Sequence, residues 1–591
     1  MIVAMKKIAL FMQAKDAPGA ILNLRRLGIV HVEHAQPSSG QDIHALRDEL
    51  ALVGQALEVL STVGGSGAKE STTSVEPIDW NMKARHIIDL HKRISQLEEF
   101  SLTLTRRISQ WEQWGDFDPG QILALCEKGI YCQLYAIAAK ELKKLPPGII
   151  VKQFFVAWGL AHCALISRQP INIGFKELEL PKQGLEKMRR RLAEDERAIT
   201  VLKKDLHNCV GCYPGLAVLK QKLEKDLTFQ EALRGMGEAG VLSFLSGYAP
   251  FDAVAALHEA AKKEKWGLMV DEPSLEDNVP TLIRNPRWIS IIKPVFKMLE
   301  VVPGYQELDT SLWFLIFFSL FFGILIGDAG YGLTYLVLTF WWQKKKGAKV
   351  SNANVFLLLY LLSSCAIIWG LLTGSFFGQA WLRLGGIKPF LPSLNNPVTM
   401  QTLCFFIGAL HLSIAHAWRA ALKFPRLACL ADIGWICVLW TAFLLARTLI
   451  LTQPFPEFGK WLVSAGLLLV IFFSHPGRSI FKTLGEGLGT VALSLMNNFT
   501  DVVSYVRLFA VGLAGVAIAE TTNAMAGGLG SGVIARLAGI LIIVFGHALN
   551  IVLGPISVLV HGVRLNVLEF SGHASVTWSG QAYKPLAEDT A

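Results

Sequence analysis

The chain has 591 residues, of which 52% are hydrophobic and 17% are charged, and its net charge is +9. Residues 1–310 hold 39 Lys and Arg against 38 Asp and Glu, whereas residues 311–570 hold 16 against 7. The basic excess therefore lies in the most apolar part of the chain, which argues against a nucleic-acid-binding protein because that function needs basic residues clustered on a soluble face. We expect a soluble half followed by a membrane half.

The soluble half shows no sign of export or of a nucleotide site. Its cysteines are scattered, which favours a reducing compartment, and the apolar run at the N-terminus is too short for a signal peptide, so we expect this half to stay in the cytoplasm. Cys209 and Cys212 have Cys-x-x-Cys spacing, but no second ligand pair follows, so a turn at a helix end is preferred to a metal or redox site. The Gly-x-x-x-x-Gly-Lys-Ser/Thr phosphate loop does not occur.

Two strand–helix–strand patterns lie in the soluble half, at residues 5–34 and 241–271. Such units are typical of one α/β lobe, with a ferredoxin-like lobe as a candidate, and the residues between them then form an insertion. The expected strands are Met5–Met12, Ile29–His34, Val241–Tyr248 and Gly267–Asp271, and the expected helices are Ala17–Leu27 and Asp252–Lys263.

The insertion opens and closes with apolar residues that recur every three or four positions. These stripes run over three segments, residues 43–60, 87–111 and 185–206. A narrow stripe of this period, interrupted only at Ser101 and Asp195, predicts helices that bury a seam against partner helices, as in a coiled-coil stalk. Residues 129–180 predict a second α/β lobe between these helices, with strands at Ile130–Ala138 and Ile149–Trp158.

The membrane half contains six clear span candidates: residues 355–378, 401–418, 431–450, 459–474, 488–526 and 533–570. A further run, Leu312–Trp342, is about 48 Å long as one helix, too long for a hydrocarbon core of roughly 30 Å and tight for two spans. The sequence Gly-Asp-Ala-Gly-Tyr-Gly at Gly327–Gly332 favours a break in its middle. A hairpin at this break gives eight spans.

Loop charge decides between seven and eight spans. With eight, loops 343–354, 419–430 and 475–487 fall on one side of the membrane. These loops carry Lys344, Lys345, Lys346, Lys349, Arg419, Lys423, Arg426, Arg478 and Lys482. The positive-inside rule makes this side cytoplasmic, the side on which the soluble half is expected. Seven spans would put the soluble half on the wrong side, so we expect eight, with both termini in the cytoplasm.

The last two apolar segments are 39 and 38 residues long, so they must tilt strongly or project into water. Each carries polar residues at helical spacing. In the first these are Asn497, Thr500, Ser504 and Arg507, with Asp501 beside them, and in the second they are His547, Asn550, Ser557, His561 and Arg564. Two aligned polar faces in otherwise apolar helices indicate an aqueous or protein-lined path.

Arg507 lies at the centre of its segment, where a charged side chain costs on the order of 2.5–3.5 kcal/mol. Because arginine stays protonated, it is a poor proton carrier, but it can stabilise a carboxylate brought next to it. A structural ion pair with Asp501, Glu520 or Glu569 is the simpler alternative. Small residues between Ala510 and Ala519 would let another helix approach closely, either to slide past or to pack statically.

At these positions the sequence resembles a known family. Ser504–Ala514, Ser-Tyr-Val-Arg-Leu-Phe-Ala-Val-Gly-Leu-Ala, resembles the Ser-Tyr-x-Arg-Leu-x-Ala-x-x-Leu-Ala motif of the membrane subunit called a or I in rotary V-type and A-type ATPases. The chain also resembles that family at five further segments: Pro303–Thr310, Gly327–Gly332, Gly546–Asn550, Val560–Leu565 and Glu569–Phe570. The resemblance extends along nearly the whole chain.

The resemblance implies a fold and a mechanism. The fold is an α-helical membrane bundle of eight transmembrane helices, the last two long and tilted, plus N-terminal cytoplasmic α/β lobes joined by an antiparallel coiled-coil stalk. Arg507 corresponds to the essential stator arginine and Arg564 to the second arginine facing the rotor. Ions would load through one half-channel, ride around the rotor ring on carboxylates and leave through another. The residues that would line the half-channels or relay ions through them are Asn497, Ser504, His547, Asn550, Ser557, His561 and Glu569.

The implied parts are a split proximal lobe (1–40 and 236–300), the stalk (41–116 and 183–235), a distal lobe (117–182), a transmembrane ion-translocation domain (301–575) and a cytoplasmic tail (576–591). The implied partners are a rotor ring of small c/K-type membrane subunits, peripheral stalk E/G-type subunits, a central stalk d/C-type subunit and membrane lipid. We expect a non-catalytic subunit in a prokaryotic cell membrane, with no cofactor, no metal and no nucleic acid.

Two positions depart from the eukaryotic relatives. Gly515 and Gly554 replace a histidine and an acidic residue, so the resemblance favours the bacterial or archaeal form and implies no relay through these two sites. A secondary transporter that uses Arg507 to bind an anionic substrate is the alternative function, although no convincing internal repeat supports it. A purely structural scaffold is the third, but it does not explain the polar faces. The sequence does not decide between H⁺ and Na⁺.

The two arginines are offset along their segments. Arg564 lies about 13 residues past the centre of its segment, or roughly 20 Å along an upright helix, whereas Arg507 is central. Both can face one interface only if the two helices tilt and are displaced along the membrane normal, and we predict that displacement.

Overall fold

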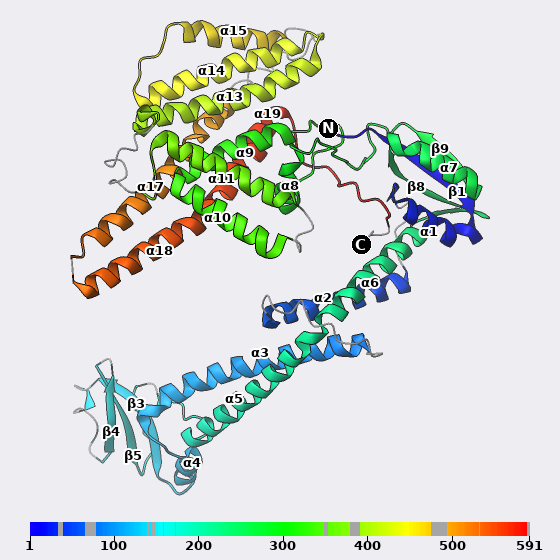
Figure 1. The fold of residues 1–591 in the computed structure, drawn as a ribbon. Coiled ribbons are helices and arrows are strands. Elements are labelled where there is room, and N and C mark those ends of the chain that lie inside the picture. The colour runs from blue at the N-terminus through cyan, green and yellow to red at the C-terminus, as the bar shows by residue number, and fades with distance from the viewer. Residues whose placement is uncertain are drawn as a thin grey trace. The chain divides into compact units, whose positions relative to one another are not determined.

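The computed structural model describes residues 1–33, 40–64, 79–138, 141–142, 146, 148–157, 159–171, 173–175, 177–347, 353–378, 390–473, 493–530 and 532–587. The chain divides into two compact units (Figure 1). The first unit comprises Met1–Met12, Leu22–Glu33 and Ser246–Ala591, and the second comprises Gln13–Ile21 and His34–Leu245.

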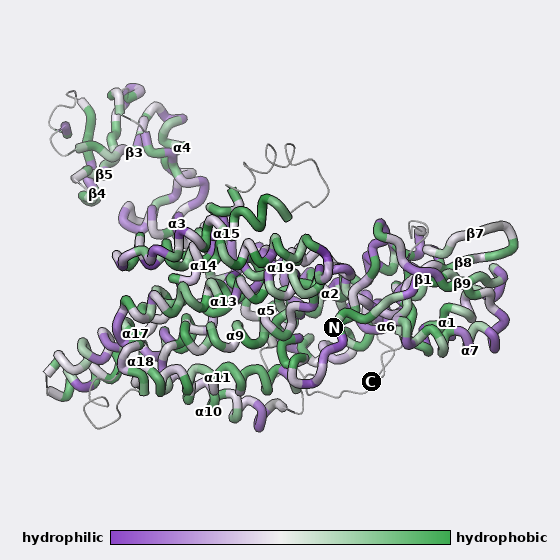
Figure 2. The backbone as a smooth tube through the Cα atoms, turned by 90° about the horizontal axis from the view of Figure 1, so that it is seen from above, coloured by the Kyte–Doolittle hydropathy of each residue, from purple (hydrophilic) through white to green (hydrophobic). Residues whose placement is uncertain are grey.

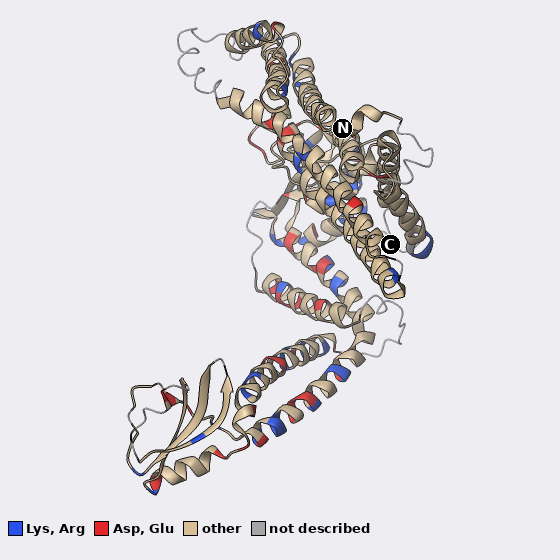
Figure 3. Cartoon of the chain, turned by 90° about the vertical axis from the view of Figure 1, so that its left-hand side faces the viewer, with Lys and Arg blue, Asp and Glu red and all other residues tan. Residues whose placement is uncertain are grey.

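The second unit is built on four long helices: α2 (Gln41–Gly64), α3 (Trp80–Trp111), α5 (Leu185–Asn208) and α6 (Tyr213–Arg234). Helix α2 packs against α6, and α3 packs against α5. Charged residues recur along these helices (Figure 3), while the predicted stripe residues Val53, Leu60, Ile87 and Leu206 are buried. The apolar stripes are therefore seams between helices, as the period predicts.

The interruptions and the cysteine pair have local explanations. Ser101 and Asp195 are both buried, and the carboxylate of Asp195 pairs with Arg191 one turn earlier, at 3.1 Å. Cys209–Cys212 form a short 3-10 helix, η5, between α5 and α6, which confirms the expected turn at a helix end.

The distal part of the second unit is a four-stranded antiparallel sheet in the order β4-β5-β3-β6. Strands β3 (Tyr131–Ala138) and β4 (Ile150–Ala157) match the two predicted strands. Sequence reasoning missed β5 (Leu160–Ser167) and β6 (Glu177–Leu178), and helix α4 (Pro119–Glu127) precedes the sheet.

The proximal lobe is a second sheet, in the order β2-β8-β1-β9. Its strands are β1 (Met5–Gln13), β2 (His31–Glu33), β8 (Leu242–Pro250) and β9 (Gly267–Asp271), with β7 (Gly237–Ala239) paired to β8 and helices α1 (Ala17–Leu27) and α7 (Val254–Glu264) between strands. The register places Leu10 opposite Leu268 and His31 opposite Tyr248. The two distant strand–helix–strand segments thus share one sheet, as the sequence predicts.

The C-terminal segment is attached to this lobe. The amide of Leu586 donates to the carbonyl of Val30 at 2.8 Å, and the hydroxyl of Tyr583 donates to the carbonyl of Ile29 at 2.7 Å. Glu307, from the motif before the first apolar helix, accepts hydrogen bonds from the amides of Gly304 and Thr577. Burial raises the pKa of Glu307, but these hydrogen bonds outweigh it, so the pKa lies below its usual range.

The apolar half forms a helical bundle in which hydrophobic residues predominate (Figure 2). Its helices are α9 (Ser311–Ile326), α10 (Ala329–Lys346), α11 (Asn354–Thr373), α13 (Pro397–Lys423), α14 (Cys429–Leu451), α15 (Phe458–Phe473), α17 (Val506–Gly527) and α18 (Val533–Ser557). Within the described ranges, five helices are long and apolar enough to span a membrane, including Leu493–Gly527 and Val533–Ala574. Helices α9 and α10 form a pair bent by 119°, and α15 is a shorter apolar helix.

The bent pair returns the chain to the end from which it started. The side chain of Asn354, at the start of α11, donates to the carbonyl of Ser290 at 3.2 Å, and Ser290 begins η7 (Ser290–Ile292), which contacts α9. Because α11 begins beside the segment that leads into α9, α10 must run back toward that end. The chain therefore folds back at the break between α9 and α10.

Asp328 holds the break between α9 and α10. Gly327 has φ +66°, a left-handed conformation that ends α9 at little cost for glycine, and Asp328 caps α10 by accepting from the amides of Gly330 and Tyr331. The carboxylate also accepts from the hydroxyl of Ser375, at 2.7 Å, and from two amides of the loop after α11. Five hydrogen bonds thus satisfy a carboxylate that is 1% exposed.

We predict that Asp328→Asn destabilises the bundle, because the amide nitrogen cannot accept the hydrogen bonds that one carboxylate oxygen now receives. The expected loss is about 1–3 kcal/mol for each buried donor left unsatisfied, and Asp328→Ala should lose more. Thermal unfolding of the purified protein in detergent measures it. Asn396→Ala removes a cap that accepts one exposed hydrogen bond and should cost about 1 kcal/mol. Equal losses of stability in Asp328→Asn and Asn396→Ala would contradict the role given to Asp328.

Candidate functional site

Two arginines meet at one buried carboxylate. The guanidinium of Arg507, on α17, donates to Glu569 Oε1 at 3.1 Å, and Arg564 Nε lies 3.6 Å from the same oxygen. The side chain of Glu569 is 6% exposed, that of Arg507 is 25% exposed and that of Arg564 is 55% exposed. Of the three proposed ion-pair partners of Arg507, the structure therefore selects Glu569.

The contact leaves hydrogen-bonding capacity unused. In the described part of the chain, Arg507 Nη1 and Glu569 Oε2 are buried atoms without a hydrogen-bond partner. An unsatisfied charged donor in a buried position is costly. Arg507 therefore has a guanidinium nitrogen that its contact with Glu569 does not use.

The helix that carries Arg564 and Glu569 changes its winding. After Ser557 the chain forms two π-helical segments, η10 (Val558–Gly562) and η11 (Leu565–Phe570), followed by α19 (Ser571–Ala574). Pro555 lies just before them and removes one helical hydrogen bond. The 3.6-residue spacing used to align the polar face thus does not apply beyond Ser557, and π-helical turns are frequent at functional sites.

The path of this helix brings the two arginines together. Asn550 donates to the carbonyl of Gly515 at 2.8 Å, and Arg507 meets Glu569 further along. Between these contacts the last helix uses 19 residues and its neighbour uses 8, so the last helix cannot run straight beside its neighbour. The predicted offset between Arg507 and Arg564 is accommodated by this difference in path.

The remaining predicted residues of the last helix divide into two groups. His547 lies 2.6 Å from the hydroxyl of Tyr331 and 3.2 Å from Asn523 Oδ1, so it bonds within the bundle, as Asn550 does. Ser557 and His561 are half-buried near the change of winding. Gly554 packs against Ile326 and Tyr335, since an added Cβ would lie 2.8 Å and 3.0 Å from their atoms.

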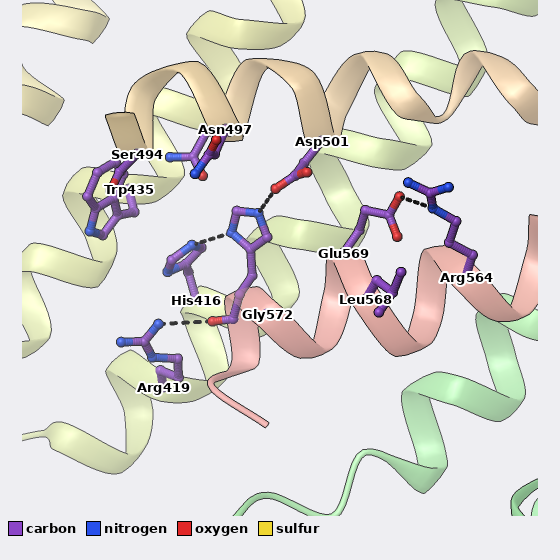
Figure 4. Close-up of a pocket in the computed structure, with 12 residues that line it drawn as sticks. His416, Arg419, Trp435, Ser494, Asn497, Asp501, Arg564, Leu568, Glu569 and Gly572 are labelled. Atoms are coloured by element: carbon purple, nitrogen blue, oxygen red, sulfur yellow. Dashed lines mark hydrogen bonds and ion pairs between the residues drawn. The ribbon is translucent and has the colours of Figure 1, made fainter. Parts of the chain in front are cut away.

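The polar residues before Arg507 face a cavity of about 430 Å³ (Figure 4). Asn497 and Asp501 line it together with Arg564 and Glu569. Ser504 instead donates to the backbone carbonyl of Asp501 at 2.7 Å, which is a local contact. The full lining is His416, Arg419, Trp435, Ser494, Asn497, Asn498, Asp501, Arg564, Leu568, Glu569, Gly572 and His573.

Sequence reasoning missed part of this lining. His416 and Arg419 lie on α13, and His573 lies on α19. His416 and His411 stand five residues apart in an otherwise apolar helix, a signal that the search for polar faces did not extend to α13. Among the described residues, no group of three or more His, Cys, Asp or Glu side chains is placed to hold a metal ion.

A second cavity, of about 220 Å³, begins on the other side of Arg507 along α17. Its lining includes Leu508, Gly512, Val516 and Glu520, together with Gly327 at the break between α9 and α10. The two cavities therefore adjoin the helical stretch Leu493–Gly527 before and after Arg507.

Comparison with known proteins assigns the family. The V-type ATP synthase subunit I 1 of Treponema pallidum is 31% identical over the whole of both chains, and the V-type ATP synthase subunit I of Borreliella burgdorferi is 30% identical over 99% of both. The chain belongs to the V-type and A-type ATP synthase subunit I family. The A-type ATP synthase subunit I of Pyrococcus abyssi is 26% identical over 70% of this chain and 65% of its own length, so the resemblance includes an archaeal relative.

Two further comparisons add little to the assignment to subunit I. No protein-family model matches the chain. A crystal structure of the cytoplasmic N-terminal domain of subunit I, a homologue of V-ATPase subunit a, covers 45% of this chain at 15% identity, with a TM-score of 0.23. These values are too low to support a structural argument. None of the relatives named above is a secondary transporter, so that alternative has no support.

We predict that the two arginines of this subunit I contribute unequally to stability. A double-mutant cycle of Arg507→Gln with Glu569→Gln should give a coupling of about 1–3 kcal/mol, because both groups are largely buried and hydrogen-bonded. The matched cycle of Arg564→Gln with Glu569→Gln should give less than about 1 kcal/mol, because Arg564 is exposed and lies farther away. Thermal unfolding of all five variants in detergent provides the measurement, and the reverse order of couplings would refute this geometry.

Proposed function

We propose that this chain is the stator subunit that carries ions past a rotor ring in a V/A-type ATP synthase. Arg507 faces the ring and stabilises the carboxylate of each passing rotor subunit in its ion-free form. The two cavities are the half-channels, one on each side of Arg507. The observation that carries this proposal is the fixed cation of Arg507, with one cavity before it and another after it along the same helical stretch, in a chain of the subunit I family.

The cation must both attract and release the rotor carboxylate. Glu569 supports this cycle, because it neutralises Arg507 when no rotor carboxylate is present and so lowers the cost of a charge in an apolar bundle. Arg564, which shares Glu569 and is exposed, is placed to meet the same rotor surface. Asn497, Ser504, Ser557 and His561 are proposed to lie along the half-channel near the soluble lobe, with Glu569 as its relay group.

The far half-channel is proposed to use different residues. Glu520 supplies the carboxylate of the second cavity, and His547 and Asn550 stabilise the helices around it through their contacts with Tyr331 and Gly515. An ion leaving the rotor there would meet an acidic group on the opposite side of Arg507. The static barrier between the cavities is then Arg507 itself.

The finer architecture belongs to the same proposal. We infer eight spans, with α9 and α10 as a hairpin and both termini in the cytoplasm of a prokaryotic cell, and an antiparallel coiled-coil stalk between proximal and distal lobes with the boundaries given above. The lobes bind peripheral stalk E/G-type subunits and a central stalk d/C-type subunit, and the chain binds no nucleotide. The return of α11 to η7 supports the hairpin.

We predict that Arg507→Ala abolishes ATP-driven ion pumping, measured with the whole complex in liposomes, while the complex still assembles. Arg507→Lys should also fail if the spread guanidinium charge matters. Arg447→Gln is the matched control, since Arg447 lies in α14 and bonds to Gln453 at 2.9 Å, away from both cavities. Normal ATP-driven pumping by the Arg507→Ala complex would contradict the proposed stator function.

We also predict that a ring of small, very apolar subunits co-purifies with the chain in mild detergent. Mass spectrometry of the purified complex identifies these subunits. If the chain purifies without such subunits although the membranes it came from still pump ions, the proposed stator role is contradicted, because that role requires a rotor ring.

A further inference from the structure

Four side chains of the bundle form a hydrogen-bonded row, which we call the histidine chain: Asp432, His416, His573 and Asp501. Figure 4 labels two of them, His416 and Asp501. His416 Nδ1 lies 3.3 Å from Asp432 Oδ1, and its Nε2 lies 2.9 Å from His573 Nδ1. His573 Nε2 lies 3.1 Å from Asp501 Oδ2. The two imidazoles are buried, whereas Asp501 is 31% exposed and lines the larger cavity.

The chain contains three hydrogen bonds, and each needs one hydrogen. Two neutral imidazoles supply only two, because each carries a single N–H. The third hydrogen must be an additional proton, carried either by an imidazole or by Asp501. With that proton present, every contact from Asp432 to Asp501 is satisfied, so the geometry of the row accommodates one transferable proton.

One end of the chain is fixed and the other is free to exchange. Asp432 is 1% exposed and lies 2.6 Å from Lys423 and 3.4 Å from Arg419, so two cations keep it ionised. Arg419 also donates to the carbonyl of His573 at 3.0 Å, which holds this residue in place. The proton therefore moves at the other end, between His573 and Asp501.

We propose that the histidine chain exchanges protons with the larger cavity through Asp501, and that the ion carried past this side is therefore H⁺. The proposal rests on the stator function proposed above. In the transfer step, the proton on His573 Nε2 moves to Asp501 Oδ2, so that an imidazolium becomes neutral and a carboxylate becomes an acid. All three hydrogen bonds persist, and no side chain rotates.

The second step returns the chain to its starting state. Asp501 releases its proton into the cavity that Glu569 also lines, and a later proton from the same cavity returns to His573 through Asp501. Imidazole is suited to this exchange near neutral pH. It is poorly suited to Na⁺, because hard cations prefer oxygen ligands.

The test is ATP-driven proton uptake into liposomes that contain the whole complex, measured between pH 6 and pH 8. The titratable and charged groups that face the chain are His411, Arg419, Lys423, Arg564 and Glu569, and all of them stay in place. His573→Gln and Asp501→Asn should lower the rate about tenfold at pH 8, where protons are scarce, and about twofold at pH 6. His86→Gln, an exposed histidine of α3, is the control and should match the unaltered complex.

The outcomes separate this proposal from the stator function. Equal rates for Asp501→Asn and the unaltered complex at every pH would overturn the relay, while loss of pumping in Arg507→Ala would keep the stator role. If a variant fails to assemble with the ring, the unaltered complex still decides: rapid acidification without Na⁺ supports the proposal. A strict requirement for Na⁺ overturns it and leaves the stator function intact.

Discussion

The carboxylate that Arg507 and Arg564 share is the contact on which the functional half of the molecule depends. A lone arginine inside an apolar bundle would cost several kcal/mol, and a lone buried glutamate would cost more. Pairing them makes both tolerable, yet one nitrogen of Arg507 and one oxygen of Glu569 remain without partners in the described structure. The ion pair thus leaves one hydrogen-bonding atom of each partner unused, which is the feature that the proposed stator function requires.

Two buried carboxylates in the same bundle are held in opposite ways. Asp328 receives five hydrogen bonds and has no unused capacity, so it fixes the break between α9 and α10. Glu569 contacts two partly exposed cationic side chains, and one of its oxygens has no hydrogen-bond partner among the described residues. The difference separates a structural carboxylate from one that can change partners, and burial alone does not distinguish them.

The sequence predicted the elements with local periodicity and missed those set by tertiary contacts. The stripes of the long helices, the shared proximal sheet and the break at Asp328 follow from spacing and turn chemistry. The pairing of Arg507 with Glu569 was one of three alternatives, because sequence spacing does not reveal how the last helix bends. Its π-helical segments changed the register after Ser557, so the expected single polar face could not be carried through.

The histidine chain shows why part of the candidate site was beyond sequence reasoning. His416, Asp432 and His573 lie on three helices, α13, α14 and α19, and each alone is an ordinary polar residue in an apolar segment. Only packing brings them into one row, and only the count of hydrogens in that row assigns it a chemistry. A fixed cation such as Arg507 can hold an anion but cannot pass a proton. The proposed ion path past it therefore needs titratable groups beside it, and the row that ends at Asp501 reaches the cavity that Glu569 also lines.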